Sequence, residues 1–249
     1  MSGAGTRPTA SLRLGPALRA ERIKLRTLPA ALATVIATPL AGAALGAAFA
    51  ASARDGAALE SVLASAMPFL QIGTILLAVY AVASEYSGRQ ISASLRAVPR
   101  RGALLAAKGA LALASTAVLA AVAVLATAAG AAAVLLADGF DSLAEADWAR
   151  MLGGIAYLVL IGALAFGFAL LVRRLMPALA GMLTAVLILS PLLRAQTEHA
   201  RWLPDAAGSQ LFAAGGDPVL TPLGGALVLL AWVVAVGAAG ALRFARSDA

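Results

Sequence analysis

Six long stretches without any Asp, Glu, Lys or Arg constrain this 249-residue chain more than any other feature. They are 19 to 29 residues long, and about 20 helical residues cross the hydrocarbon core of a bilayer. A charge at mid-bilayer costs about 2.5–3.5 kcal/mol on insertion scales, so charge-free stretches are what spanning requires. These stretches are continuously apolar, whereas the strands of a membrane β-barrel alternate apolar and polar residues. The sequence therefore predicts an all-α polytopic membrane protein with six transmembrane helices, near residues 28–51, 62–83, 109–136, 151–172, 175–193 and 222–242.

The basic residues predict which side each connection occupies. If the N-terminus is cytoplasmic, 15 Lys and Arg residues fall on the inner side and 4 on the outer side, as the positive-inside rule requires. Both termini are then cytoplasmic. We interpret the net charge of +7 as this asymmetry across a membrane, and we expect no nucleic-acid partner.

The composition argues against an enzyme. Hydrophobic residues make up 61% of the chain and charged residues 12%, which is too apolar for a soluble domain. There is no cysteine, His199 is the sole histidine, and no phosphate-binding glycine loop occurs. We expect no catalytic residue, no metal ligand and no cofactor bound by this chain.

An amphipathic helix is predicted over 11–26. Leu14, Leu18 and Leu25 share one face, with arginines on the other, which is typical of an interfacial helix on the inner leaflet. Glu21, three residues before Lys24, falls within the apolar face. Its carboxylate either pairs with a nearby arginine or meets another protein segment at the membrane surface.

A second amphipathic helix is predicted between spans two and three, within 84–101. Ile91, Leu95 and Val98 recur at helical spacing, and Pro99 ends the helix. This apolar stripe faces either lipid or a soluble partner. The basic residues beside it suit anionic headgroups as well.

Polar side chains inside the spans are few and uncharged. Gln71 and Thr74 in the second span are candidates for a substrate path, and the alternative is that they hydrogen-bond between helices. With no carboxylate relay in the spans, we do not expect a proton- or sodium-coupled transporter.

These features resemble ABC-2-type transporter permeases, in particular the small six-span actinobacterial type. The closest local likeness is Ser84-Glu85-Tyr86-Ser87-Gly88-Arg89-Gln90-Ile91, followed by Leu95 and Val98-Pro99-Arg100-Arg101. Weaker likenesses are Glu21 with Lys24, and Leu203-Pro204-Asp205-Ala206-Ala207-Gly208 before the last span.

The resemblance implies that residues 1–249 form a single transmembrane domain of an ATP-driven exporter in a bacterial plasma membrane. Two permeases, identical or different, would pair with two cytosolic ATP-binding subunits, which would hold ATP and Mg²⁺. The segment after span two would be the coupling helix that docks on the ATPase, through Glu85, Tyr86, Gly88, Arg89, Ile91, Leu95, Val98, Pro99, Arg100 and Arg101. The alternative function is a non-transporting membrane scaffold or sensor.

Overall fold

The structure, a computed structural model, describes residues 29–53, 58–86, 101–139, 147–215 and 217–246. Within these ranges all regular secondary structure is helical. Six segments are long and apolar enough to cross a membrane, so the chain is a multi-pass membrane protein, and the predicted fold class is confirmed. They are α2 (Pro29–Ser52), α3 (Leu59–Tyr86), α5 (Arg101–Ala137), α6 (Trp148–Val172), the run α7–η1–α8 (Leu175–Arg194) and α10 (Pro222–Arg246).

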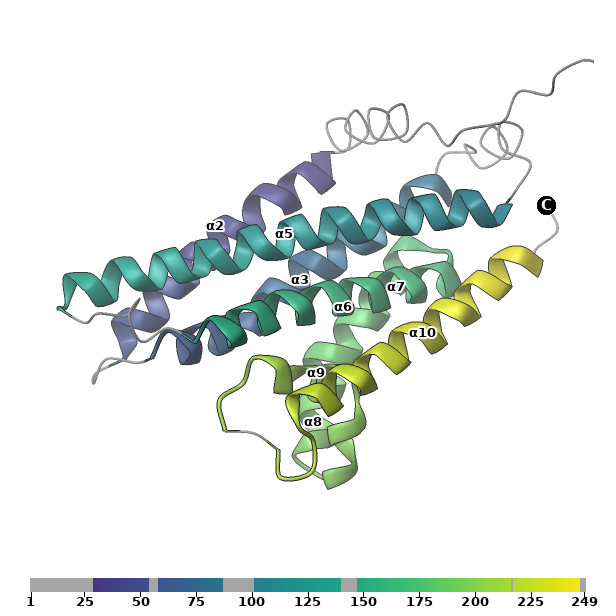
Figure 1. Cartoon of the computed structure of the whole chain (residues 1–249). Coiled ribbons are helices and arrows are strands. Elements are labelled where there is room, and N and C mark those ends of the chain that lie inside the picture. The colour runs from purple at the N-terminus through teal and green to yellow at the C-terminus, as the bar shows by residue number, and fades with distance from the viewer. Residues whose placement is uncertain (1–28, 54–57, 87–100, 140–146, 216, 247–249) are drawn as a thin grey trace, which may run out of the picture.

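The long helices lie side by side (Figure 1). α2 packs against α5 and α3, α3 packs against α5 and α6, and α10 covers the other side of α6. Two residues join α6 to α7, and Arg173 adopts the left-handed conformation (φ 60°) that turns the chain there. The Arg173 guanidinium donates to the Arg243 carbonyl oxygen at 2.6 Å. The C-terminal ends of α6 and α10 therefore lie at the same end of the bundle.

Glycine permits the closest approach between helices. A Cβ added to Gly46 of α2 would collide with the Thr127 carbonyl oxygen of α5, and one added to Gly130 of α5 would collide with the Ala43 carbonyl oxygen of α2. Lipid tails are as apolar as the side chains, so helices in a bilayer associate through such close contacts between small residues.

Buried hydroxyl groups inside the spans bond to their own helix. Thr38, Thr116 and Thr127 each donate to the carbonyl oxygen four residues earlier, at 2.7 to 2.8 Å. This bond satisfies a polar group that would otherwise be costly to bury in an apolar environment.

The fifth span is not a regular α-helix. α7 (Leu175–Thr184) passes into a π-helical turn, η1 (Ala185–Leu189), and then into α8 (Ser190–Arg194). Pro191 lacks an N–H group and cannot donate to the carbonyl of Leu187, which accounts for the local widening.

The connection from α8 to α10 is a packed element. It contains η2 (Glu198–Trp202), α9 (Pro204–Gly208) and η3 (Ser209–Leu211). Residues 205–208 are buried. Gly208 lies against the Tyr157 ring of α6 and Leu229 of α10.

We call residues 198–212 the inserted segment, because part of it lies between α6 and α10. Figure 1 shows α9 beside the first turns of α10.

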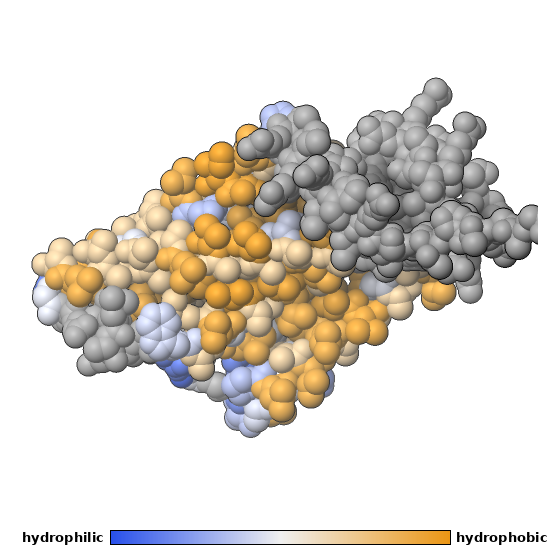
Figure 2. Space-filling model, turned by 45° about the horizontal axis from the view of Figure 1, so that its top comes forward, coloured by the Kyte–Doolittle hydropathy of each residue, from blue (hydrophilic) through white to orange (hydrophobic). Residues whose placement is uncertain are grey.

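The lateral surface of the bundle is apolar, as a lipid-facing surface must be. Figure 2 shows orange and pale residues over most of the described part of one face. Large exposed hydrophobic side chains occur on every span, for example Leu40, Val118, Leu152, Ile188 and Val234.

The α2–α5 contact yields a prediction. Gly46→Ala places a methyl group against the α5 backbone, which cannot move aside locally, so we expect a loss of about 1–3 kcal/mol of stability. Gly237→Ala is the matched control, because nothing lies within 4 Å of its Cβ position. Thermal unfolding in detergent should show a lower midpoint for Gly46→Ala only. Equal midpoints for the two variants would contradict this packing.

Candidate functional site

A buried side-chain hydrogen bond joins α3 to α6 inside the bundle. The Tyr157 hydroxyl donates to Gln71 Oε1 at 2.6 Å. Gln71 is 4% exposed and Tyr157 is 3% exposed. The Tyr157 ring also packs against Phe212 of the inserted segment, with ring centroids 5.0 Å apart.

An ion pair between α8 and α9 lies close to this bond. Arg194 Nη2 approaches Asp205 Oδ2 at 3.3 Å. The arginine side chain is 41% exposed and the aspartate side chain 9%. Asp205 stands in the first turn of α9, where the positive end of the helix favours a carboxylate.

Burial raises the pKa of Asp205 above its usual value, although the Ser190 hydroxyl, Arg194 and the backbone N–H groups of Asp205 and Ala206 act in the opposite direction. Desolvation therefore outweighs the favourable neighbours. The carboxylate is held in a position where its charged form costs free energy.

The two polar pairs line one cavity of about 300 Å³. Its lining comes from α3, α6, η1, α8 and the inserted segment with Ala213. The residues are Ala64, Met67, Pro68, Gln71, Tyr157, Val186, Leu187, Pro191, Arg194, Asp205, Ser209, Phe212 and Ala213. Pro68, Pro191 and Arg194 are exposed at the rim, whereas Met67, Gln71, Tyr157, Val186 and Asp205 are buried. The cavity thus combines an apolar wall with a few polar groups, as small-molecule sites do.

A second cluster of ion pairs holds the outer edge of the inserted segment. Arg201 pairs with Glu198 at 3.0 Å and with Asp217 at 3.2 Å. Asp217 Oδ1 also accepts from the backbone N–H of Val219 and Leu220. The Val219 N–H, helped by that of Leu220 and by Arg201, lowers the pKa of Asp217.

The structure separates the two residues predicted to line a substrate path. Gln71 faces the cavity. Thr74 is fully buried, donates to the Gln71 carbonyl oxygen at 3.0 Å and does not line the cavity.

Other predicted site residues cannot be placed. Glu21, Lys24 and the coupling residues of 87–100 lie outside the described residues. Glu85 and Tyr86 lie at the end of α3, and Arg101 is the first residue of α5. For these three residues the structure describes the backbone but not the side chains.

Sequence reasoning missed Tyr157, Arg194 and Asp205 as members of one site. Tyr157 is an aromatic residue in an apolar span, and nothing in its neighbours sets it apart. The sequence around Asp205 did offer a clue. A single carboxylate among the small and apolar residues of Leu203–Gly208 is more typical of a buried helix start than of a solvated loop.

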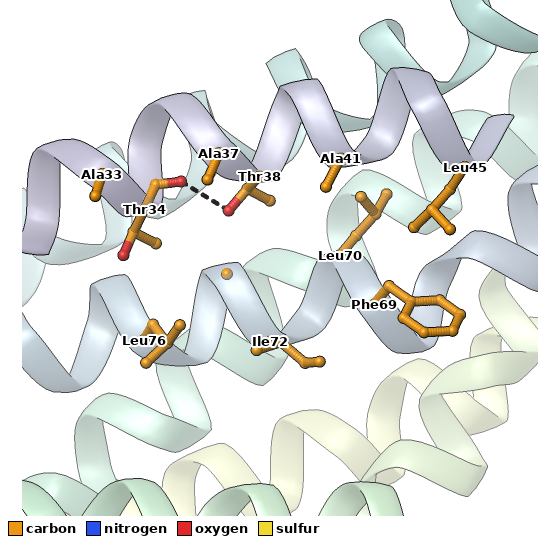
Figure 3. A pocket seen from close by; sticks show the side chains of 11 residues that line it. Ala33, Thr34, Ala37, Thr38, Ala41, Leu45, Phe69, Leu70, Ile72 and Leu76 are labelled. Atoms are coloured by element: carbon orange, nitrogen blue, oxygen red, sulfur yellow. Dashed lines mark hydrogen bonds between the residues drawn. The ribbon is translucent and has the colours of Figure 1, made fainter. Parts of the chain in front are cut away.

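A larger, apolar groove of about 400 Å³ lies between α2 and α3 (Figure 3). Alanines of α2 face Phe69, Leu70 and Leu76 of α3 across it. The Thr38 hydroxyl on its wall donates to the Thr34 carbonyl oxygen at 2.7 Å. Thr34 and Thr38 both donate their hydroxyl hydrogens within α2, so these two side chains offer a ligand no free donor.

No protein-family model matches this chain, and no curated protein matches it either. Within the described residues, no three His, Asp or Glu side chains gather as a metal site would need. What the cavity residues offer is hydrogen bonding and charge around an apolar pocket.

The Tyr157–Gln71 bond can be measured by a double-mutant cycle. Tyr157→Phe leaves the buried Gln71 carbonyl without its donor, at a cost of about 1–3 kcal/mol. Adding Gln71→Leu removes that unsatisfied group, so the double variant should lose less stability than the sum of the single variants. Chemical unfolding in detergent measures all three, with Thr74→Val as a control. An additive result would mean that the two side chains do not interact.

The two aspartates should give opposite pH dependences. The pKa of Asp205 is raised on folding, so its contribution to stability falls as the pH rises from the ordinary Asp value through the raised one. The pKa of Asp217 is lowered, so its contribution is present above the ordinary value and is lost as the pH falls.

Unfolding midpoints between about pH 2 and about pH 8 test this pair, because the Asp217 contribution changes below about pH 4 and the Asp205 contribution changes above it. Relative to the wild type, Asp205→Asn should gain most at the higher pH, and Asp217→Asn should lose most there. Parallel pH curves for the two variants would be incompatible with this assignment.

Proposed function

We propose that this chain is the transmembrane permease subunit of an ATP-driven exporter of the ABC-2 type. It would act in a bacterial plasma membrane as a dimer of permeases, identical or different. Separate cytosolic subunits would bind and hydrolyse ATP with Mg²⁺.

The observation that carries this proposal is the length of the helices on either side of the connection 87–100. α5 has 37 residues, about 55 Å at 1.5 Å per residue, whereas the hydrocarbon core is about 30 Å thick. Its first eight residues, Arg101–Lys108, precede the charge-free stretch. α3 likewise continues to Tyr86, past Glu85.

Such helical extensions would hold the connection clear of the bilayer, within reach of a soluble partner. A stiff helix also transmits a push along its axis into the bundle. This geometry favours a docked partner for Ile91, Leu95 and Val98 over a stripe lying on lipid.

The charges at the bundle ends agree with this arrangement. Arg173, Arg174 and Arg243 stand at the end where α6 and α10 finish. By the positive-inside rule this end would face the cytoplasm, and in Figure 1 α5 begins at the end of the bundle where α10 finishes.

The mechanism follows from these parts. ATP binding would close the partner subunits, and the coupling segment would carry that motion into α3 and α5. Because α3 supplies Gln71 and α6 supplies Tyr157, a shift of α3 relative to α6 would alter the cavity that they share.

The test is whether an ABC ATP-binding subunit copurifies with the tagged full chain from its native membrane. Ile91→Asp with Leu95→Asp places two charges on the apolar stripe, so we expect the ATPase to be lost while membrane insertion is kept. Ala93→Asp with Ala97→Asp is the matched control, because these positions fall on the opposite face of the predicted helix.

Retention of the ATPase by the stripe variant at the wild-type level would refute the docking assignment. If no ABC ATPase copurifies even with the wild type, the exporter proposal itself fails.

A further inference from the structure

We propose that the cavity between α3, α6, α8 and the inserted segment binds a small amphiphile whose polar end carries hydrogen-bond-accepting oxygens, with a carboxylate as the best fit. This is a ligand site within a single chain. It does not depend on an ATPase partner or on transport.

Free hydrogen-bond donors point to an acceptor on the ligand. Gln71 accepts from Tyr157 through Oε1, while its amide nitrogen donates to no group in the described part of the chain and is not fully enclosed. An amide nitrogen has two N–H groups. Gln71 is 4% exposed and lines the cavity, so its side chain borders the cavity and is shielded from bulk water.

Arg194 adds donors at the rim. A guanidinium has five N–H groups in a planar fork that suits a carboxylate. In the described structure Arg194 makes one side-chain hydrogen bond, from Nη2 to Asp205. The rest of the fork remains available beside the cavity.

Asp205 is already engaged by Arg194. Its Oδ2 accepts from Arg194 Nη2 at 3.3 Å, and Ser190, Arg194 and the backbone near Asp205 and Ala206 favour its charged form. A cationic head group would compete with Arg194 for this carboxylate. The raised pKa of Asp205 also lessens its repulsion of an anion as the pH falls.

The remaining walls are apolar and suit a short tail. Met67, Val186 and Phe212 are buried around the polar groups. The volume of about 300 Å³ is at the lower end of the range for small-molecule sites, about 300–1,000 Å³. A molecule with a compact head and a chain of a few carbons fits this space, whereas a whole phospholipid does not.

Three probes of six carbons each test the head group. Hexanoate, hexanamide and hexylammonium differ in charge and in hydrogen-bonding groups. Binding is measured by saturation-transfer NMR on the full chain in nanodiscs of zwitterionic lipid, with empty nanodiscs subtracted to remove partitioning. We expect affinity to fall in the order hexanoate, hexanamide, hexylammonium.

Two variants assign the binding to this cavity. Gln71→Leu removes the free donors, so hexanoate and hexanamide should each lose about tenfold in affinity. Thr74→Val lies on the same helix outside the cavity and should leave both unchanged. Arg194→Gln should weaken hexanoate more than hexanamide, and retained hexanamide binding shows that the cavity is still folded.

Tightest binding of hexylammonium would overturn the acceptor-head assignment in favour of a cationic ligand. Equal losses in Gln71→Leu and Thr74→Val would overturn the location. Binding of none of the probes above the empty-nanodisc level would overturn the site. These binding results do not depend on whether an ATPase copurifies with the chain.

Discussion

Backbone contact through glycine is the constraint on which the rest of this bundle depends. In a bilayer, burial against lipid gives no preference for one helix partner, so surfaces must fit closely enough to gain dispersion energy. Gly46 and Gly130 let α2 and α5 touch backbone to backbone, and the missing side chain of Gly167 in α6 lets it lie against the α10 backbone at Val236 and Gly237. These contacts fix the spacing of the helices, and that spacing decides what else fits between them.

The inserted segment is the clearest consequence. Gly153 of α6 lies against the Leu211 carbonyl, and Gly225 of α10 lies against the Ala207 carbonyl. Larger residues at these glycines would keep the segment out of the bundle. Its insertion brings Asp205 beside Arg194 and completes the cavity over the Tyr157–Gln71 bond. The polar site therefore exists because glycines on α6 and α10 leave room for the inserted segment.

Much of the fold follows from local patterns, because spanning a membrane needs only length, apolarity and the absence of charge. For that reason the six apolar helices could be predicted, whereas the extension of α5 back to Arg101 could not. The site depends on contacts distant in sequence, such as Gln71 with Tyr157, and no periodicity encodes which helix faces which. Gln71 could be singled out as a polar residue in a span, whereas Tyr157 could not, since nothing in its own helix indicates the hydroxyl's partner.

The most direct test asks whether the inserted segment lies against α6. A Cβ at Gly154 would stand 3.7 Å from Phe212 Cβ, within the about 3.5–4.5 Å of a disulfide. The chain has no cysteine, so Gly154→Cys with Phe212→Cys introduces the only pair. Ala165→Cys with Phe212→Cys is the control, about 16 Å farther along α6. We expect an oxidised cross-link in membranes for the first pair alone. A first pair that stays reduced, or cross-links equal in both, would contradict it.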